Sequence, residues 1–297
     1  MTASAYLLGR DIASLQAPFA AEDKLFVATG LDHQTIDPGT FSHCTFANIS
    51  FKEASLKNTR FIDCVFVGCY FRRTSIEECM FNGCRFFDCD FPHVAIKGCD
   101  FRYCKFWRCF IPFGEMELSL PQEPNLRQEL SRNLSLAAAG LGFPSEARAY
   151  RFCELRSNEE HLKAAVTAAS KWYRDHYDPL RRLGALLGLI LSILNRLLWG
   201  YGERPLILAR NFLLIALIIF PLIYYSLRTG IQKSNGDAVS FVDTIYFSLH
   251  NILPAGFDSN MGAGTAGVQA LSGIESLFAV VTASLFASYL FRWILHR

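Results

Sequence analysis

The sequence predicts a multidomain membrane protein: a β-solenoid of short repeats, then a helical hairpin, then two membrane-spanning helices with a short apolar segment between them. Three observations lead to this prediction. A large apolar residue recurs at every fifth position from Phe41 to Ile111. Charged residues become sparse after Arg210. Two long apolar runs flank the segment 240–259, whose expected helix ends near Ile252 and is too short to cross a bilayer by itself.

Composition argues against several classes of function. The 297 residues are 51% hydrophobic, so a disordered chain is not expected. The formal net charge is only +2, which gives no support for a nucleic-acid partner. The sequence shows no phosphate-binding loop, metal-ligand cluster or nucleophile–base arrangement, so we expect neither an enzyme nor a cofactor. The first 15 residues lack a basic start followed by an apolar run, so no signal peptide is expected.

The five-residue period predicts a solenoid. A helix repeats every 3.6 residues and a strand every 2, so neither keeps each fifth side chain on one side. A chain that turns a corner every five residues does so. Leu56, Ile76 and Ile96 replace Phe at positions 20 residues apart, which indicates four repeats in each coil. The fifteen repeats then make just under four coils, about 18 Å tall at one strand spacing per coil.

This pattern resembles the pentapeptide-repeat family, whose fold is a right-handed quadrilateral β-helix. The resemblance implies that residues 39–112 form a column with Phe side chains stacked inside. Nine of the ten Cys lie on the same grid without C-x2-C spacing, so we expect buried reduced thiols rather than disulfides or a metal site. Residues 40–112 carry ten Lys and Arg against seven Asp and Glu, and this net charge of +3 argues against mimicry of DNA. We therefore expect a rigid scaffold or docking surface.

The segments on either side of the repeat are predicted from weaker patterns. Residues 1–38 are expected to form an N-terminal cap. The residues there that keep the five-residue spacing are Phe26, Leu31 and Ile36. Residues 123–178 show helical periodicity with a break at 140–144, which predicts a cytoplasmic helical hairpin. Its second helix is expected to run to about Tyr177.

Residues 180–199 raise a question about the membrane. The run 183–194 has twelve residues without a charge and is flanked by Arg181, Arg182 and Arg196. A spanning helix needs about 20 apolar residues, so this run alone is short. If it crossed, the Cys-rich column would lie on the oxidising side of the membrane. Unpaired thiols would be oxidised there, so this arrangement is disfavoured. We therefore favour an interfacial amphipathic helix and keep a further spanning helix as the alternative.

Residues 207–295 are predicted to form a transmembrane domain. The first run, 207–227, has 21 residues, about 31 Å of helix, and the last run, 268–295, is longer. Arg210 near the start of the first run and Arg292 near the end of the last place both ends on the cytoplasmic side. We therefore expect a multi-pass protein of the inner (plasma) membrane, in contact with lipid, with its N-terminal domain and C-terminus in the cytoplasm.

The segment between these runs predicts a short helix followed by a turn. Ser240 with Asp243 three positions later forms a capping box for a helix that ends near Ile252. Tyr246 and Phe247 are expected to wedge this helix against its neighbours. The layout resembles the re-entrant pore loop of two-helix, potassium-channel-like proteins, in which YFS precedes the ion filter. The order of the parts is similar to that of bacterial pentapeptide-repeat ion channels.

The resemblance implies a homotetrameric channel for monovalent cations, since one chain supplies only one pore loop. The filter would comprise Pro254, Ala255, Gly256, Phe257 and Asp258. Pro254 stands where the family has Thr, and Asp258 stands where it has a second Gly, so we expect weak rather than strict potassium selectivity. Glu275 matches a Glu of such channels and is expected either to brace the filter or to line the pore. The alternative is a membrane-anchored scaffold with a non-conducting pore domain.

Overall fold

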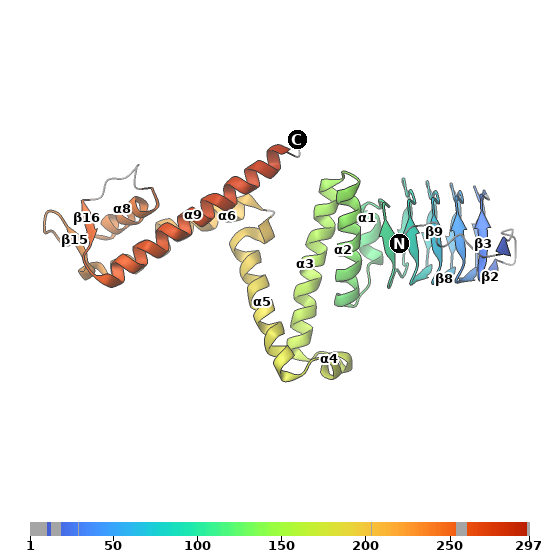
Figure 1. The fold of residues 1–297 in the computed structure, drawn as a ribbon, viewed down its shortest axis with the longest axis horizontal. Helices are drawn as coiled ribbons and strands as arrows, with labels where there is room; N and C mark the ends of the chain where they lie inside the picture. Colours follow the sequence, from blue (N-terminus) through green and yellow to red (C-terminus); the bar gives the residue numbers. More distant parts are fainter. Residues whose placement is uncertain (1–10, 13–18, 29, 203, 254–259, 296–297) are drawn as a thin grey trace. The chain divides into compact units, whose positions relative to one another are not determined.

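The computed structural model describes residues 11–12, 19–28, 30–202, 204–253 and 260–295. The chain forms two compact units, residues 1–186 and 187–297. The first unit holds the repeat and the hairpin, and the second holds most of the apolar helices (Figure 1).

A β-solenoid of about four turns fills most of the first unit, with its short strands stacked side by side (Figure 1). The first parallel sheet consists of β1 (Asp11–Ile12), β3 (Lys24–Val27), β6 (Thr45–Ala47), β9 (Val65–Val67), β12 (Arg85–Phe87) and β14 (Lys105–Trp107). The second consists of β4 (Thr35–Ile36), β7 (Ser55–Lys57), β10 (Ser75–Glu77) and β13 (Ala95–Lys97). The third consists of β2 (Ala20–Glu22), β5 (Thr40–Ser42), β8 (Arg60–Ile62) and β11 (Met80–Asn82). Single parallel bridges such as Ser50 with Tyr70 join the coils on the fourth side.

The register of the sheets confirms the 20-residue coil. Ile76 pairs with Leu56 on one side and with Ile96 on the other, so each residue lies beside its equivalent in the next coil. The Phe side chains stack in the same way: the ring centroids of Phe46 and Phe66 are 4.8 Å apart with nearly parallel planes. Like residues therefore stack on like throughout the core, which is what the repeat requires.

The nine Cys of the repeat are buried and form no disulfide. Their thiols bond to backbone carbonyls: Cys64 Sγ lies 3.3 Å from the carbonyl oxygen of Phe41 and 3.4 Å from that of Ile62. Burial raises the pKa of the Cys84 thiol well above its ordinary value. A protonated, buried thiol is a poor nucleophile. The burial of all nine side chains shows that they act as small residues of the core.

Part of the segment expected to form a cap is a further coil of the solenoid. Strands β2, β3 and β4 pair in register with the next coil, and Phe26 stacks on Phe46 with ring centroids 5.1 Å apart. Leu31 and Ile36 are both buried. The five-residue apolar spacing is enough to bury these residues in the solenoid. Their repeats lack the small side chain that lies two positions earlier in the later repeats.

Helices cover the C-terminal end of the solenoid: α1 (Phe113–Met116), the 3₁₀ turn η2 (Glu117–Ser119), α2 (Pro124–Gly140) and α3 (Pro144–Thr167). Leu130, Leu134 and Tyr150 join the apolar core of the repeat. The Asn133 side chain pairs with β14 as a further strand would: its Oδ1 accepts from the Phe106 N–H at 2.7 Å, and its Nδ2 donates to the Phe106 carbonyl at 3.1 Å. The open edge of the last coil is thus satisfied by a helix side chain.

Replacing Asn133 with Ala is expected to lower the free energy of unfolding of the first unit by about 1 to 3 kcal/mol. The change leaves the N–H and the carbonyl of Phe106 without their partner at the end of the sheet. Chemical denaturation of the full chain, followed by far-UV circular dichroism, measures the effect. Gln122→Ala, at an exposed position just before α2, is the control and should stay within about 0.5 kcal/mol of the unchanged protein. Equal stability of the two variants would contradict the role of Asn133.

The second helix of the hairpin is shorter than expected. It ends at Thr167 because Ala168 takes a left-handed conformation (φ 50°, ψ 45°), and a separate short helix α4 (Lys171–His176) follows. The prediction of one helix to about Tyr177 was therefore wrong. His161 of α3 joins the two parts, because its Nδ1 and Nε2 each lie 2.9 Å from a hydroxyl, of Tyr173 and Tyr177 respectively.

Helix α5 (Pro179–Trp199) begins in the first unit and ends in the second, where the turn η3 (Gly200–Gly202) follows. The first long apolar helix comprises α6 (Pro205–Leu214), a π-helical turn η4 (Ile215–Ile219) and α7 (Phe220–Ser226). The turn η5 (Arg228–Gly230) and strand β15 (Ile231–Lys233) lead to α8 (Phe241–Ile252), and strand β16 (Met261–Ala263) leads to α9 (Ala266–Leu295).

Three helices in the described part of the chain are long and apolar enough to cross a membrane: residues 179–202, 205–226 and 266–291. The first of these includes the segment for which we favoured an interfacial position. The uncharged run has only twelve residues, but the helix continues past Arg196 and reaches about the length that a bilayer requires. Length therefore no longer argues against a third span, and the position of α5 stays a prediction.

Candidate functional site

A buried carboxylate joins three elements of the second unit. Glu275 of α9 is fully buried in the described structure. Its Oε2 accepts hydrogen bonds from the Tyr224 hydroxyl of α7 at 2.8 Å and from Asn251 Nδ2 of α8 at 2.9 Å. Its Oε1 bonds to the Ser248 hydroxyl of α8. One side chain thus holds the short helix against both long apolar helices.

Further hydrogen bonds fix the C-terminal half of α8. The Ser272 hydroxyl donates to Asn251 Oδ1 at 2.9 Å, and the Ser276 hydroxyl donates to the Asn251 carbonyl at 3.0 Å. Ser248 also bonds to the carbonyl of Ala216 in the π-helical turn, at 2.8 Å. A π-helical turn shifts the backbone hydrogen bonds, and here it lies just before Pro221, which has no N–H to donate. The polar groups of this cluster therefore satisfy one another.

Apolar contacts close the cluster from the side. Phe247 of α8 is buried and packs edge-on against Tyr224, with ring centroids 4.9 Å apart. Phe220, Ile231 and Val268 complete the same core. Water is excluded there, so the hydrogen bonds of Glu275 are costly to break.

The N-terminal end of α8 is capped as the sequence predicts. Asp243 N–H donates to the Ser240 hydroxyl at 3.3 Å, and the Asp243 carboxylate accepts from the Ser240 N–H at 2.9 Å. The bond from that N–H holds the pKa of Asp243 below its ordinary value. Lys233 Nζ lies 3.1 Å from the same carboxylate, which ties the end of β15 to the start of the helix. The capping box is confirmed.

A two-stranded antiparallel ladder brings the two ends of the segment 234–260 together. Ile231 pairs with Ala263 and Lys233 pairs with Met261. The Ser234 N–H donates to the Asn260 carbonyl at 2.8 Å just beyond the ladder. The chain therefore leaves the ladder, forms α8 and comes back to the same place, as Figure 1 shows for β15, β16 and α8.

The structure brings together only some of the residues singled out from the sequence. Ser240 and Asp243 lie at the start of α8, and Phe247 and Glu275 lie in the buried cluster. Tyr246 was expected to wedge α8 against its neighbours, but within one chain it does not, because its side chain is 51% exposed. The expected filter, Pro254, Ala255, Gly256, Phe257 and Asp258, lies outside the described residues.

Sequence reasoning missed most partners of Glu275. Tyr224 and Asn251, and Ser272 which bonds to Asn251, were not identified, since they lie in mostly apolar runs. A signal was present in α9, where Ser272, Glu275 and Ser276 are spaced three and four apart and so share one helix face. A buried acid in an apolar helix needs such partners, so a search of the neighbouring helices for hydroxyl and amide groups was warranted.

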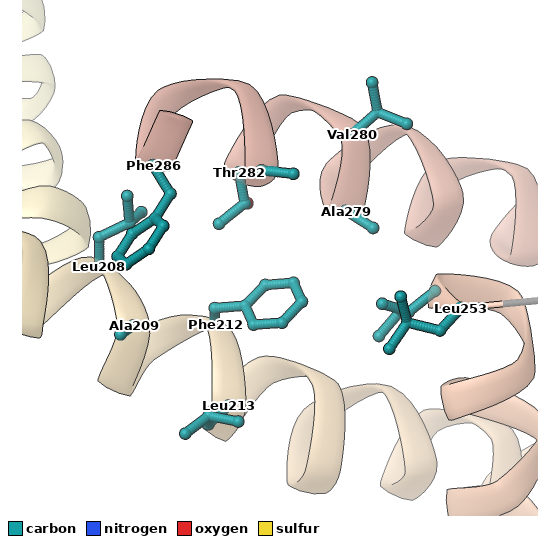
Figure 2. Close-up of a pocket in the computed structure, with 11 residues that line it drawn as sticks. Leu208, Ala209, Phe212, Leu213, Leu253, Ala279, Val280, Thr282 and Phe286 are labelled. Atoms are coloured by element: carbon teal, nitrogen blue, oxygen red, sulfur yellow. The ribbon is translucent and has the colours of Figure 1, made fainter. Parts of the chain in front are cut away.

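An apolar cavity of about 490 Å³ lies beside the cluster, between α6, α9 and the end of α8 (Figure 2). Leu208, Phe212, Leu253 and Phe286 line it. Thr282 also faces it, but its hydroxyl donates to the Phe278 carbonyl at 2.8 Å. The cavity therefore offers no unpaired polar group of Thr282 to orient a polar ligand. Among the described residues no group of His, Cys, Asp and Glu could hold a metal ion.

Comparison with known proteins identifies the repeat. A family model described as "Pentapeptide repeat region" matches residues 39–112. The comparison with curated proteins gives no match. The matched residues are those of the solenoid, so this part of the chain is a pentapeptide-repeat region; the model does not extend to the helices.

Two similar solved structures each cover about a third of this chain. A trypsin-treated variant of QnrB1, a plasmid-mediated fluoroquinolone resistance protein, is 20% identical with a TM-score of 0.25, covering 30% of this chain and 52% of that protein. The pentapeptide repeat protein Rfr23 from the cyanobacterium Cyanothece 51142 is 10% identical with a TM-score of 0.24, covering 33% of this chain and 80% of that one. This chain thus spans about half the length of QnrB1.

Proposed function

We propose that this pentapeptide-repeat chain is one subunit of a homotetrameric, cation-conducting channel. Its second unit would supply two membrane-spanning helices and one re-entrant segment to a shared pore. The repeat column would serve as a rigid cytoplasmic scaffold or docking surface.

The observation that carries the proposal is the course of the segment 234–260. It starts and ends at the β15–β16 ladder, and between these points α8 packs against both long helices. A helix of 12 residues is about 18 Å long, too short to span a bilayer. A segment that enters a membrane and returns on the same side, braced from behind by a buried acid, fits a pore loop. The hydrogen bonds of Glu275 favour the bracing role over the pore-lining one.

The need for several copies follows from the face of α8 that the single chain leaves uncovered. Val242 and Tyr246, one helical turn apart, are 58% and 51% exposed. Backbone that is not regular helix is tolerated at membrane depth only where protein or a water-filled cavity covers it. Sister subunits would supply that cover, and four copies would surround one axis.

Selectivity for cations follows from the orientation of α8. Its C-terminal end carries a partial negative charge, and four such ends directed at one axis would favour a positive ion there. The sequence after this end provides Asp258 for a ring of carboxylates, which is typical of less discriminating cation pores. We therefore propose weak selectivity among monovalent cations.

Labelling of two engineered cysteines is expected to place Ala169 and Asn235 on opposite sides of the membrane. Both residues are exposed, and α5 and the first long apolar helix lie between them. If α5 is interfacial, only one span separates them; if α5 also crosses, two spans do and both face the same side. Ala169→Cys and Asn235→Cys are each treated with a membrane-impermeant maleimide in intact and in lysed cells. The unsubstituted protein measures the background from Cys153, which is only partly buried.

Only Asn235→Cys should react in intact cells, and both variants should react after lysis. Reaction of both variants in intact cells would show that α5 spans the membrane and would contradict a cytoplasmic repeat column. Such a result would not contradict the proposed re-entrant course of the segment 234–260.

The copy number of the purified protein tests the tetramer. Native mass spectrometry from detergent is expected to give four chains per particle. Tyr246→Ala should weaken the assembly, whereas Tyr103→Ala, at a side chain 60% exposed on the repeat, should not. A monomer that is folded and membrane-inserted would contradict the channel and would favour a membrane-anchored scaffold.

A further inference from the structure

The outer face of the first sheet differs in composition from the other outer faces of the solenoid. Phe26, Phe46 and Phe66 point into the core, so the residues on either side of each of them point outward. In the second sheet such outward positions hold Lys57 and Glu77, which pair at 3.0 Å and stay partly exposed. In the first sheet the outward positions are mostly apolar, and several of them are buried.

Two neighbouring columns of side chains make up this surface, which we call the first-sheet face. The strand register places equivalent residues of successive coils side by side. The members of the face are Leu25, Thr45 and Val65 in one column and Val27, Ala47, Val67, Phe87 and Trp107 in the other. The ring of Phe87 stacks on that of Trp107, with centroids 4.6 Å apart. The face therefore runs without a break from β3 to β14.

The middle of the first-sheet face is covered, although its side chains point outward. The members that are 7% exposed or less are Leu25, Thr45, Ala47, Val65 and Phe87. These fractions are those of a single chain, so the cover comes from the same chain. Trp107, the member nearest the helices at the C-terminal end of the solenoid, is 40% exposed, so those helices do not account for the cover.

The start of the chain is held at the edge of this same sheet. Strand β1 pairs with β3, with Asp11 beside Lys24 and Ile12 beside Leu25. Residues 1–10 precede β1 and lie outside the described part of the chain. Ten residues reach up to about 33 Å, whereas the four strand spacings from β3 to β14 measure about 19 Å. This segment is therefore long enough to cross the whole first-sheet face.

The composition of residues 1–10 suits an apolar surface. The segment reads MTASAYLLGR, in which Tyr6, Leu7 and Leu8 form a run of three large side chains. It carries no Asp or Glu, so its attraction to the face is apolar rather than ionic.

The link 13–18 is too short to supply the same cover. It joins β1 to β2, and a path from β1 out to β12 and back measures about 38 Å. The chain from Ile12 to Phe19 reaches only about 24 Å when fully extended. The link therefore cannot cover Phe87 in β12, whereas residues 1–10 have no second end to return.

We propose that residues 1–10 dock on the first-sheet face, with Tyr6, Leu7 and Leu8 against β6, β9 and β12. The docking surface of the repeat column is then occupied by a peptide of its own chain, and another protein could use this face only by displacing that peptide. All the residues involved belong to the first unit, so the inference does not depend on the proposed channel.

The reactivity of an engineered thiol tests the proposal. Val65→Cys places a small thiol on the outer side of β9, and the purified full-length protein is treated with a maleimide. A covered thiol reacts only when its cover opens, so the labelling should be slow. Replacing Tyr6, Leu7 and Leu8 together with Ser removes the apolar contacts and should raise the labelling rate of Cys at position 65 about tenfold or more. Peptide mapping by mass spectrometry separates this site from the native cysteines.

Two further positions on the solenoid are the matched controls. Ile62→Cys lies on the outer side of the third sheet, where the side chain is exposed, and should react equally fast with and without the triple Ser change. Val94→Cys lies in the core and should stay slow in both, which shows that the triple change does not unfold the column.

Photo-crosslinking identifies the occupant of the face. Benzoylphenylalanine replaces Tyr6, and unlabelled protein is mixed with isotopically heavy protein before illumination. Cross-links should join position 6 to β6, β9 or β12 of the same chain. Cross-links to the heavy chain would show that the face is an interface between copies, and cross-links only to lipid or to another face of the solenoid would place the segment elsewhere. Either result, or a labelling rate of Val65→Cys that the triple Ser change leaves unaltered, would overturn the proposal.

Discussion

Glu275→Leu is expected to lower the free energy of unfolding of the membrane domain by about 3 kcal/mol, because it leaves the buried hydroxyl of Tyr224 and one N–H of the half-buried Asn251 amide without their acceptor. Ser248 retains the carbonyl of Ala216 as a partner and therefore loses less. The loss should appear as a lower thermal unfolding temperature of the detergent-solubilised protein, and as lower cation flux if α8 must be held still for conduction.

Glu275→Gln is the matched control for this prediction. Its amide oxygen can still accept from Tyr224 and Asn251, and its NH₂ can donate to the Ser248 hydroxyl, so the geometry of the cluster is preserved. It should lose less than half the stability that Glu275→Leu loses. If both variants unfold like the unchanged protein, Glu275 does not hold α8 in place, and the bracing role is wrong.

Phe66→Ala is expected to lower the free energy of unfolding of the first unit by about 3 to 5 kcal/mol. The Phe66 ring lies in the middle of a column, with the rings of Phe46 and Phe86 each 4.8 Å away, and the side chain is fully buried. Its removal leaves a cavity that neighbouring coils can fill only by breaking their register. Denaturant unfolding of the full chain, followed by far-UV circular dichroism, measures the loss.

Tyr103→Ala provides the control on the same solenoid. Its side chain is 60% exposed, so the change should stay within about 0.5 kcal/mol. A small effect of Phe66→Ala, comparable to that of Tyr103→Ala, would mean that the coils are not held together by the Phe column. Stacking of Phe side chains in the core would then not explain the five-residue period.

The solenoid could be predicted from the sequence because its information is local and repeated. Each coil places Phe66, Phe86 and their equivalents by the same five-residue spacing, so no long-range contact has to be guessed. The same spacing at Phe26 and Ile36 was sufficient to extend the column by a coil, although those repeats lack the small partners. In these repeats the five-residue spacing of apolar residues was more informative than the identity of the residues between them.

The polar cluster could not be assembled from the sequence because its members come from three separate elements. Tyr224, Asn251 and Glu275 lie in three separate, mostly apolar runs, and no period connects them. The β15–β16 ladder was missed for a similar reason: its strands have three residues each, too few to show an alternating pattern. The break after Thr167 depends on the left-handed backbone of Ala168. Alanine does not favour that conformation, so its residue type gives no sign of the break.

Cation flux into liposomes that contain the purified protein tests the central claim most directly. The account predicts passage of both potassium and sodium through intact assemblies, none through protein-free liposomes, and less through those made with Glu275→Leu. Absence of flux at every voltage applied, with folded tetramers verified in the same liposomes, would contradict it.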